Sequence, residues 1–92
     1  MIDNSARYVA SRKLTASEIS GEAVILNLRD GNYYGLNQVA AEVWRWLQEP
    51  RTLDQLESLV TAKFEVGPER ARQDLTKLLQ DLETRKLIEV AA

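Results

Sequence analysis

The sequence predicts an α+β fold: a small winged helix-turn-helix-like domain, with a three-stranded antiparallel sheet followed by three helices. The chain changes character once, near Asn37, where segments typical of strands give way to amphipathic segments typical of helices. An Asp30-Gly31 pair lies between two apolar runs, which is a strong hairpin signal. Gly67-Pro68 separates the last two amphipathic segments, as expected for the turn of a helix-turn-helix unit.

Three segments predict the strands. Arg7–Leu14 is the first, although its alternation is weak, and a polar connection at Ser17–Glu22 follows it. Ala23–Leu28 is the clearest strand, because it is apolar and β-branched. Its residues Val24, Leu26 and Leu28 share one face. Tyr33–Leu36 is expected to return as the third strand, and Leu87–Val90 to form a short extended tail in the place of a wing.

The hairpin between the second and third strands has two possible registers. A two-residue loop at Asp30-Gly31 places Tyr33 opposite Leu28, whereas a three-residue loop places Tyr34 there. We prefer the three-residue loop, because it puts Tyr34 and Leu36 on the core face and buries Leu36 beside Leu26 and Leu28. A slip of one residue would exchange the two faces. In either register Gly31 can adopt positive φ without a Cβ penalty.

The helices are predicted from periodicity and from their end signals. The first covers Gln38–Gln48 and is stopped by Pro50. Thr52 and Gln55 form a capping-box pair that opens the second. The third runs from Pro68 to about Lys86. Their apolar stripes are Val39, Ala40, Val43, Trp44, Trp46 and Leu47; Leu53, Leu56, Leu59, Val60 and Phe64; and Ala71, Leu75, Leu78, Leu79 and Leu82.

The composition favours a binding module over an enzyme. The chain of 92 residues is expected to form a single domain over residues 1–92, and it has neither His nor Cys. It therefore lacks an imidazole base, a thiolate nucleophile, a disulfide and the usual zinc ligands. We expect no catalytic residue, no metal and no cofactor. No apolar run is long enough to cross a bilayer, and the N-terminus does not resemble a signal peptide, so a cytoplasmic location is expected.

The charge balance argues against nucleic acid as a partner. Twelve Lys and Arg residues face fourteen Asp and Glu residues, for a net charge of −2. The predicted third helix, which would correspond to the recognition helix of a DNA-binding domain, carries nearly balanced charge. A near-neutral helix compensates poorly for phosphate charge. A DNA-binding winged helix is therefore a less favoured alternative.

The segment Tyr33–Leu36 is the most suggestive one for binding. It is aromatic, contains Gly35 and carries no charge. The hairpin supplies one neighbour only, so its other edge could remain open, and an open edge can accept a strand from a partner chain. The alternative is an edge covered by a helix or by the N-terminal strand. Composition alone does not separate these two interpretations.

The run Leu28–Asn37, followed by Ala40–Trp44, resembles the PqqD-like family. The same resemblance continues through Thr52–Leu56, Phe64, Pro68-Glu69, Asp74-Leu75, Leu78-Leu79, Leu82 and Leu87-Ile88. Members of this family are recognition elements that bind the leader peptides of ribosomally made, post-translationally modified peptides. The stand-alone proteins of lasso-peptide biosynthesis look most similar. The peptide chaperone of pyrroloquinoline quinone biosynthesis is the alternative.

The resemblance implies a binding mode, in which a leader peptide adds an antiparallel strand to the third strand. Backbone pairing would then come from Asn32, Tyr33, Tyr34, Gly35 and Leu36. The groove wall would come from Asp74, Leu75, Leu78 and Leu82, although the spacing of these leucines is also that of core residues. Val66 could help to line a pocket for the Tyr of a Tyr-x-x-Pro element, and Arg85 or Lys77 could contact acidic leader residues. The catalytic residues would belong to a separate leader peptidase resembling transglutaminases, followed by a cyclase.

Overall fold

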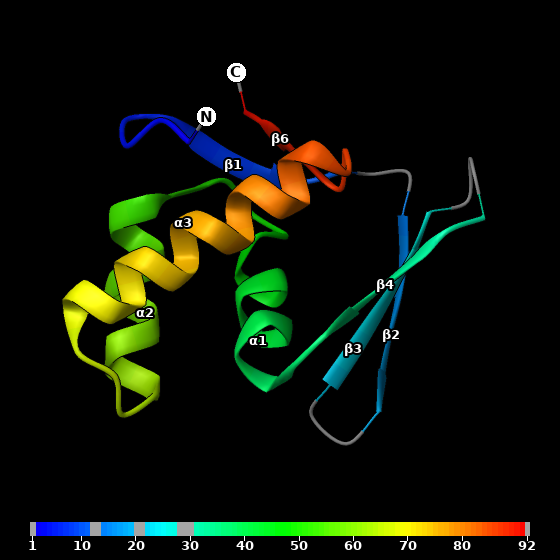
Figure 1. Cartoon of the computed structure of the whole chain (residues 1–92). Helices are drawn as coiled ribbons and strands as arrows, with labels where there is room; N and C mark the ends of the chain where they lie inside the picture. Colours follow the sequence, from blue (N-terminus) through cyan, green and yellow to red (C-terminus); the bar gives the residue numbers. More distant parts are fainter. Residues whose placement is uncertain (1, 12–13, 20–21, 28–30, 92) are drawn as a thin grey trace.

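The computed structural model describes residues 2–11, 14–19, 22–27 and 31–91. Within them the elements are β1 (Arg7–Ala10), β2 (Leu14–Ile19), β3 (Glu22–Asn27), β4 (Tyr33–Leu36), α1 (Gln38–Trp46), β5 (Arg51–Thr52), α2 (Leu53–Lys63), α3 (Pro68–Thr84) and β6 (Ile88–Val90). Figure 1 shows α1 between α2 and the sheet of β2, β3 and β4, with β1 and β6 together near the chain ends. The predicted α+β class, with a small antiparallel sheet and three helices, is confirmed.

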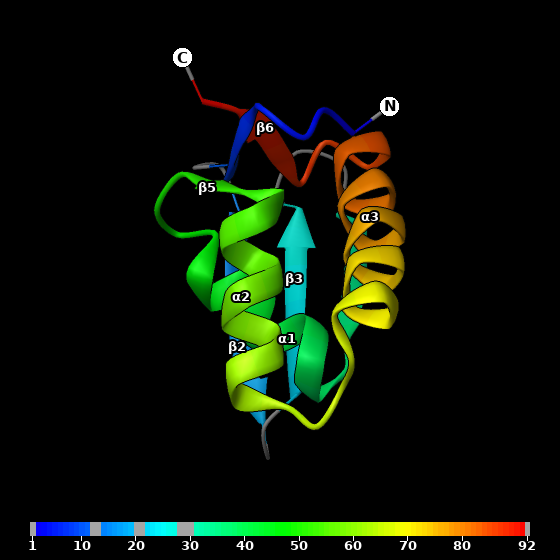
Figure 2. The ribbon, with the colours of Figure 1, turned by 90° about the vertical axis from the view of Figure 1, so that its left-hand side faces the viewer.

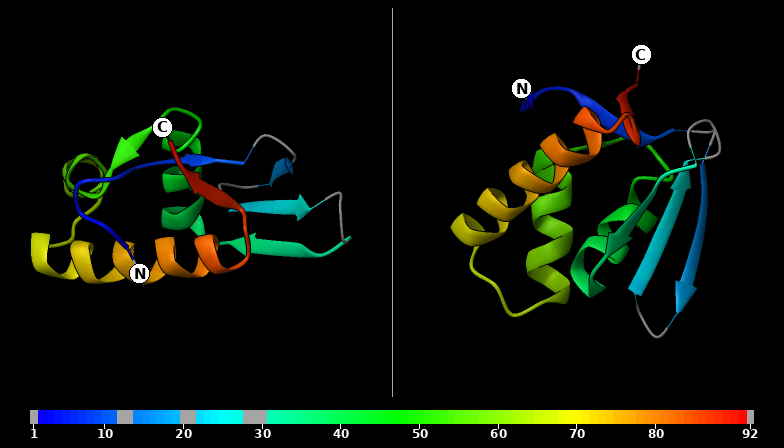
Figure 3. Two further views of the ribbon diagram at one scale, coloured as in Figure 1. Left: turned by 90° about the horizontal axis from the view of Figure 1, so that it is seen from above. Right: turned by 45° about the vertical axis from the view of Figure 1, so that its right-hand side comes forward.

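The strands form two sheets where the sequence predicted one. β2, β3 and β4 pair in that order, and β5, β1 and β6 form a second sheet; the right-hand view of Figure 3 separates the two. The single strand predicted at Arg7–Leu14 is wrong, because β1 ends at Ala10 and Leu14 begins a strand of the other sheet. The polar connection predicted at Ser17–Glu22 is also wrong, because β2 continues to Ile19 and pairs with β3. Strand pairing uses backbone groups, so the polar side chains of this segment do not prevent it.

The buried face of β3 is the opposite of the predicted one. Ile25 is 0% exposed and Ala23 is 2% exposed, whereas Val24 and Leu26 remain 43% and 37% exposed. Leu28, the third residue of the predicted core face, lies outside the described residues. Both faces of this strand are apolar, so periodicity does not distinguish them. Packing of the sheet against α1 selects the face that carries Ile25.

The hairpin register also differs from both predicted alternatives. Leu26 pairs with Tyr33 and Ile25 pairs with Tyr34, so the connection is longer than either predicted loop. The Asn27 N–H donates to the carbonyl of Asn32 at 2.8 Å and closes the hairpin. Paired residues of a sheet direct their side chains to the same face. Because Ile25 is buried on the core face, its partner Tyr34 faces the core as well. The predicted core-facing orientation of Tyr34 and Leu36 is confirmed.

Gly31 has the positive φ predicted for it, at 76°. Its N–H donates to the carbonyl of Asn27 at 2.9 Å, within the connection between β3 and β4. Asp30, the other residue of the predicted turn pair, lies outside the described residues.

The helices begin where they were predicted, and α1 and α3 end slightly earlier than predicted. The side chain of Asn37 accepts a hydrogen bond from the Ala40 N–H at 2.9 Å and caps α1. Thr52 and Gln55 form the predicted capping box of α2. The helix α3 ends at Thr84. The predicted stripes supply most of the core residues, which are Tyr8, Ala10, Ala23, Ile25, Leu36, Ala41, Val43, Trp44, Leu47, Leu53, Leu56, Val60, Ala71, Leu75, Leu79, Leu82, Leu87 and Ile88.

The C-terminal segment is tied to the start of the chain. The predicted extended tail becomes β6, which pairs with β1. Between α3 and β6 the chain reverses through Lys86, which has a positive φ of 61°. The Leu87 N–H donates to the Leu82 carbonyl at 2.9 Å, and the Lys86 N–H donates to the Glu83 carbonyl at 3.0 Å. These are the two hydrogen bonds of a Schellman motif, which sets the direction of the chain as it leaves the helix.

The two long helices are joined by an ion-pair cluster. Arg72 on α3 contacts Asp54 at 2.7 Å and Glu57 at 3.2 Å, both on α2. The hydrogen bond that Arg72 donates to the Asp54 carboxylate is the main reason that the pKa of Arg72 is raised above its usual value. Figure 2 shows α2 and α3 on either side of the view, with β3 visible between and behind them. The C-terminal end of α3 lies near β4, where Arg85 contacts the Tyr34 ring.

Candidate peptide-binding groove

The strand β4 lies at the edge of its sheet. The order β2-β3-β4 leaves its second edge without a strand partner among the described residues, and β2 pairs with the far side of β3. The alternative in which the N-terminal strand covers this edge does not apply, because β1 pairs with β5 and β6. Figure 1 shows β4 as the strand that leads into α1.

The hydrogen-bond pattern decides which backbone groups of β4 face the open edge. In antiparallel sheets, hydrogen-bonded and non-hydrogen-bonded pairs alternate. Because Asn27 and Asn32 are hydrogen-bonded, the next such pair is Ile25 with Tyr34. Leu36 follows in the same series. Asn32, Tyr34 and Leu36 therefore direct their backbone groups toward β3. The N–H and C=O groups of Tyr33 and Gly35 point the other way, which reduces the five expected pairing residues to two.

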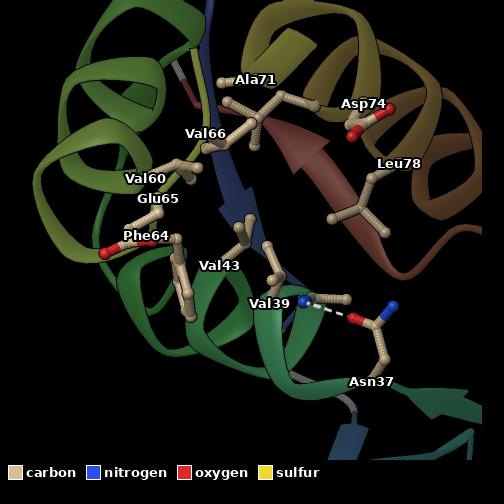
Figure 4. A pocket seen from close by; sticks show the side chains of 12 residues that line it. Asn37, Val39, Val43, Val60, Phe64, Glu65, Val66, Ala71, Asp74 and Leu78 are labelled. Carbon is tan, nitrogen blue, oxygen red and sulfur yellow. Dashed lines mark hydrogen bonds between the residues drawn. The ribbon is translucent and has the colours of Figure 1, made fainter. Parts of the chain in front are cut away.

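An apolar pocket of about 500 Å³ lies between the start of α1, the α2–α3 connection and α3. Figure 4 shows its lining side chains, with Val39 and Asn37 facing Asp74 and Leu78 across it. Four of the predicted site residues line this pocket: Val66, Asp74, Leu75 and Leu78. Of these, Leu75 is buried in the core and Leu78 is only partly buried.

Sequence reasoning missed several residues of the apolar pocket. They are Asn37, Val39, Ala40, Val43, Val60, Phe64, Glu65 and Ala71. Val39 carries the clearest missed signal, because it begins an amphipathic helix on the border of its apolar stripe and remains 39% exposed. Phe64 and Glu65 belong to a connection whose path depends on how α2 packs on α3. Their place in the pocket therefore had no signature in the local sequence.

A second, more polar pocket of about 330 Å³ lies between β4 and the C-terminal end of α3. Its lining includes the predicted residues Asn32, Tyr33, Tyr34 and Arg85. The Arg85 guanidinium lies over the Tyr34 ring, 4.8 Å from its centroid, and so links α3 to the edge strand. The two pockets lie along α3 and share no lining residue; we call them together the α3 groove.

The charges of the α3 groove differ between its ends. The apolar pocket includes the carboxylates of Glu65 and Asp74, and Asp74 is ion-paired with Arg70 at 3.2 Å. The polar pocket includes the cationic side chains of Arg85 and Lys86. A peptide in this groove would meet acidic groups beside the start of α1 and basic groups beside the start of β4.

Three predicted site residues are placed elsewhere. Leu82 is 1% exposed and belongs to the core, and Leu36 is buried there too. Lys77 lies on another face of α3, together with Glu69, Arg72, Gln73, Thr76 and Gln80. Consecutive helix residues are turned by about 100°. Lys77 is therefore directed away from Leu78 and from the groove.

The described residues contain no cluster of three or more His, Cys, Asp or Glu side chains that could hold a metal ion. Among the same residues, no helix is long and apolar enough to cross a membrane.

An open strand edge beside an apolar groove, on a winged-helix-like scaffold, is the architecture of a domain that binds peptides by strand addition. The family model described as "Coenzyme PQQ synthesis protein D (PqqD)" matches residues 22–88. The chain therefore belongs to the PqqD family, as the resemblance in its sequence predicted.

Two solved structures have the same fold. One is described as "TbiB1 in Complex with the TbiA(beta) Leader Peptide"; it has a TM-score of 0.82 and 27% identity, and the match covers 91% of this chain and 98% of that chain. The other is "Lasso peptide synthetase B1 complexed with the leader peptide", with a TM-score of 0.78, 21% identity, and coverage of 89% and 96%. No curated protein matches the sequence.

Proposed function

We propose that this chain binds the leader region of a ribosomally made precursor peptide and presents it to a separate processing enzyme in lasso-peptide biosynthesis. The observation that carries the proposal is the open edge of β4 beside the α3 groove. The similarity to TbiB1, whose structure is described as a complex with a leader peptide, supports the same ligand class. The leader would add as an antiparallel strand to β4.

Backbone hydrogen bonds and side-chain contacts would both contribute to the free energy of binding. The outward N–H and C=O groups of Tyr33 and Gly35 would make four hydrogen bonds, each contributing about 0.5–1.5 kcal/mol net. Micromolar to nanomolar binding requires about 8–12 kcal/mol. Side chains of the peptide that enter the α3 groove would supply the difference. Backbone pairing would thus give general affinity, and the pockets would select the leader.

In this proposal the chain is not itself an enzyme and uses no cofactor. It acts in the cytoplasm, and its partner is a separate leader peptidase resembling transglutaminases, followed by a cyclase. The absence of His and Cys from the sequence agrees with this division, because the peptidase would supply the nucleophile and the base.

A second candidate function is peptide chaperoning in pyrroloquinoline quinone biosynthesis. The matching family model carries that description, which is the observation in its favour. Both functions use the same edge and groove, so they differ in the peptide that binds best. Parallel binding measurements with a lasso leader and with a quinone-cofactor precursor peptide would separate them.

The test compares two substitutions in one helix. Leu78→Asp adds a charge to the wall of the apolar pocket, whereas Gln80→Asp adds the same charge on another face of α3. With labelled TbiA(beta) leader peptide as the probe, we expect Leu78→Asp to weaken binding at least about tenfold, equivalent to about 1.4 kcal/mol. Gln80→Asp should leave the affinity unchanged.

Circular dichroism must first show that both variants are folded. Equal affinity of both folded variants and the parent chain would contradict a groove-bound leader. A scrambled peptide controls for sequence-independent binding.

A further inference from the structure

Gly35 occupies a position where the chain's own packing does not require glycine. A Cβ atom added there would meet no atom within 4 Å. Gly35 does not have a positive φ, which among the described glycines is found at Gly31. Glycine in a strand interior is destabilising relative to alanine, and it often marks a site where another molecule approaches closely. Close approach of a binding partner to this backbone would account for glycine at this position.

The missing side chain leaves a gap in an exposed apolar surface. On the outer face of the sheet, away from the helices, Val24 pairs with Gly35 and Leu26 pairs with Tyr33. Val24, Leu26 and Tyr33 are three of the five large hydrophobic residues that are exposed in the described part of the chain. Tyr33 is 76% exposed. We call this surface the outer face; its gap lies at Gly35, beside Val24 and Tyr33.

The register of an added strand places one of its side chains over this gap. The outward backbone groups of Gly35 would pair with a single residue of an antiparallel strand. Directly opposite residues direct their side chains to the same face of a sheet. The side chain of that peptide residue therefore emerges on the outer face, while its two neighbours in the peptide face α3.

We propose that the peptide residue opposite Gly35 is a large apolar or aromatic one, and that Gly35, Val24 and Tyr33 form its subsite on the outer face. This inference rests on the proposed function. A large side chain leaning over glycine covers the exposed backbone and buries the neighbouring apolar surface, as in the aromatic rescue of edge glycines. The domain thus contacts peptide side chains on both faces of the sheet. Alternate residues enter the α3 groove, and the residue opposite Gly35 covers the gap.

The experiment uses a displayed library of random short peptides, selected separately on the parent chain and on Gly35→Val. We expect the parent chain to enrich peptides with a large apolar residue at one fixed position. Gly35→Val fills the gap, so at that position it should enrich glycine, alanine or serine and leave the other preferences unchanged. It should also weaken a peptide selected on the parent chain at least about tenfold, with affinity restored when that one residue becomes alanine.

The control is Ser17→Val, which adds the same side chain at an exposed position opposite Val24, on the side of β3 away from the open edge of β4, and does not fill the gap at Gly35. It should retain the parent preferences. Gly35→Ala, a smaller change, serves as a second variant if thermal unfolding shows that Gly35→Val is destabilised.

Each alternative outcome has a defined meaning. Identical preferences for the parent chain and folded Gly35→Val would overturn the outer-face subsite and leave the proposed function intact. Failure of the parent chain to enrich any peptide would overturn both. If Gly35→Val instead abolishes self-association seen by sedimentation and keeps the peptide preferences, the outer face binds a second copy of the chain, and the inference is wrong.

Discussion

At the scale of single residues, the contact between Arg85 and Tyr34 is the side-chain link between α3 and the edge strand. The guanidinium lies 4.8 Å from the centre of the ring, within the range of a cation–π interaction. Tyr34 is held on the core side of β4 because its partner Ile25 is buried. Arg85 therefore covers an aromatic ring whose position is set by the sheet. The contact orders the polar end of the α3 groove.

We expect Arg85→Ala to lower the free energy of unfolding by about 0.5–1 kcal/mol, the usual value of an exposed cation–π pair. Urea denaturation of Arg85→Ala, Tyr34→Leu and the double variant would isolate the pairwise contribution. Lys77→Ala, on another face of the same helix, is the matched control. Additive effects of the two groove substitutions would show that the pair contributes no coupling energy.

At the scale of elements, α3 combines a structural face with a binding face. Leu79 is completely buried, whereas the adjacent Leu78 lines the apolar pocket. The helix presents both because successive residues are turned by about 100°. Its C-terminal end is fixed by the Schellman hydrogen bonds, with Leu82 and Leu87 buried on either side of the reversal. This helix end requires a positive φ at Lys86, which is an unfavourable backbone conformation for a residue other than glycine.

Replacement of Lys86 by glycine tests the energetic cost of this positive φ. A non-glycine residue in the left-handed region carries a penalty of about 1–2 kcal/mol, while glycine adds chain entropy to the unfolded state. We expect Lys86→Gly to raise the free energy of unfolding by up to about 1 kcal/mol. The measurement is urea denaturation at constant pH and salt, with Lys86→Ala as the control for loss of the charge. A glycine variant less stable than the alanine variant would contradict the assignment.

At the scale of the whole molecule, the net charge of −2 disfavours a polyanionic partner such as nucleic acid. A DNA-binding domain compensates for phosphate charge with a basic surface, and its affinity falls steeply with salt. Here the apolar pocket carries carboxylates, and the far face of α3 mixes both signs of charge. The molecule as a whole is suited to a partner held by backbone pairing and apolar contacts.

We therefore expect the affinity for the leader probe to change less than about threefold between low and moderate salt, because few ions are released on binding. Under the same conditions a random DNA duplex should show no measurable binding. Fluorescence anisotropy with both labelled ligands makes the comparison. Tight duplex binding that weakens steeply with salt would favour the rival winged-helix function.

Features that depend on short-range chemistry could be predicted from the residues alone. The start of α2 follows from the capping pair of Thr52 and Gln55, and the positive φ at Gly31 follows from a missing Cβ atom. The apolar stripes of the helices predicted most of the core, because a period near 3.6 marks one face. The uncharged segment Tyr33–Leu36 predicted the candidate edge, since its lack of charge is visible without a fold.

Tertiary structure alone decided the faces, the register and the membership of the sheets. Ala23–Leu26 is apolar at every position, so only packing against α1 could select Ile25 for the core. That selection placed Tyr34 toward α3 and left Gly35 on the outer face. The apolar pocket likewise joins residues from α1, the α2–α3 connection and α3. Such long-range contacts depend on the packing free energy of the whole chain, which no local pattern in the sequence contains.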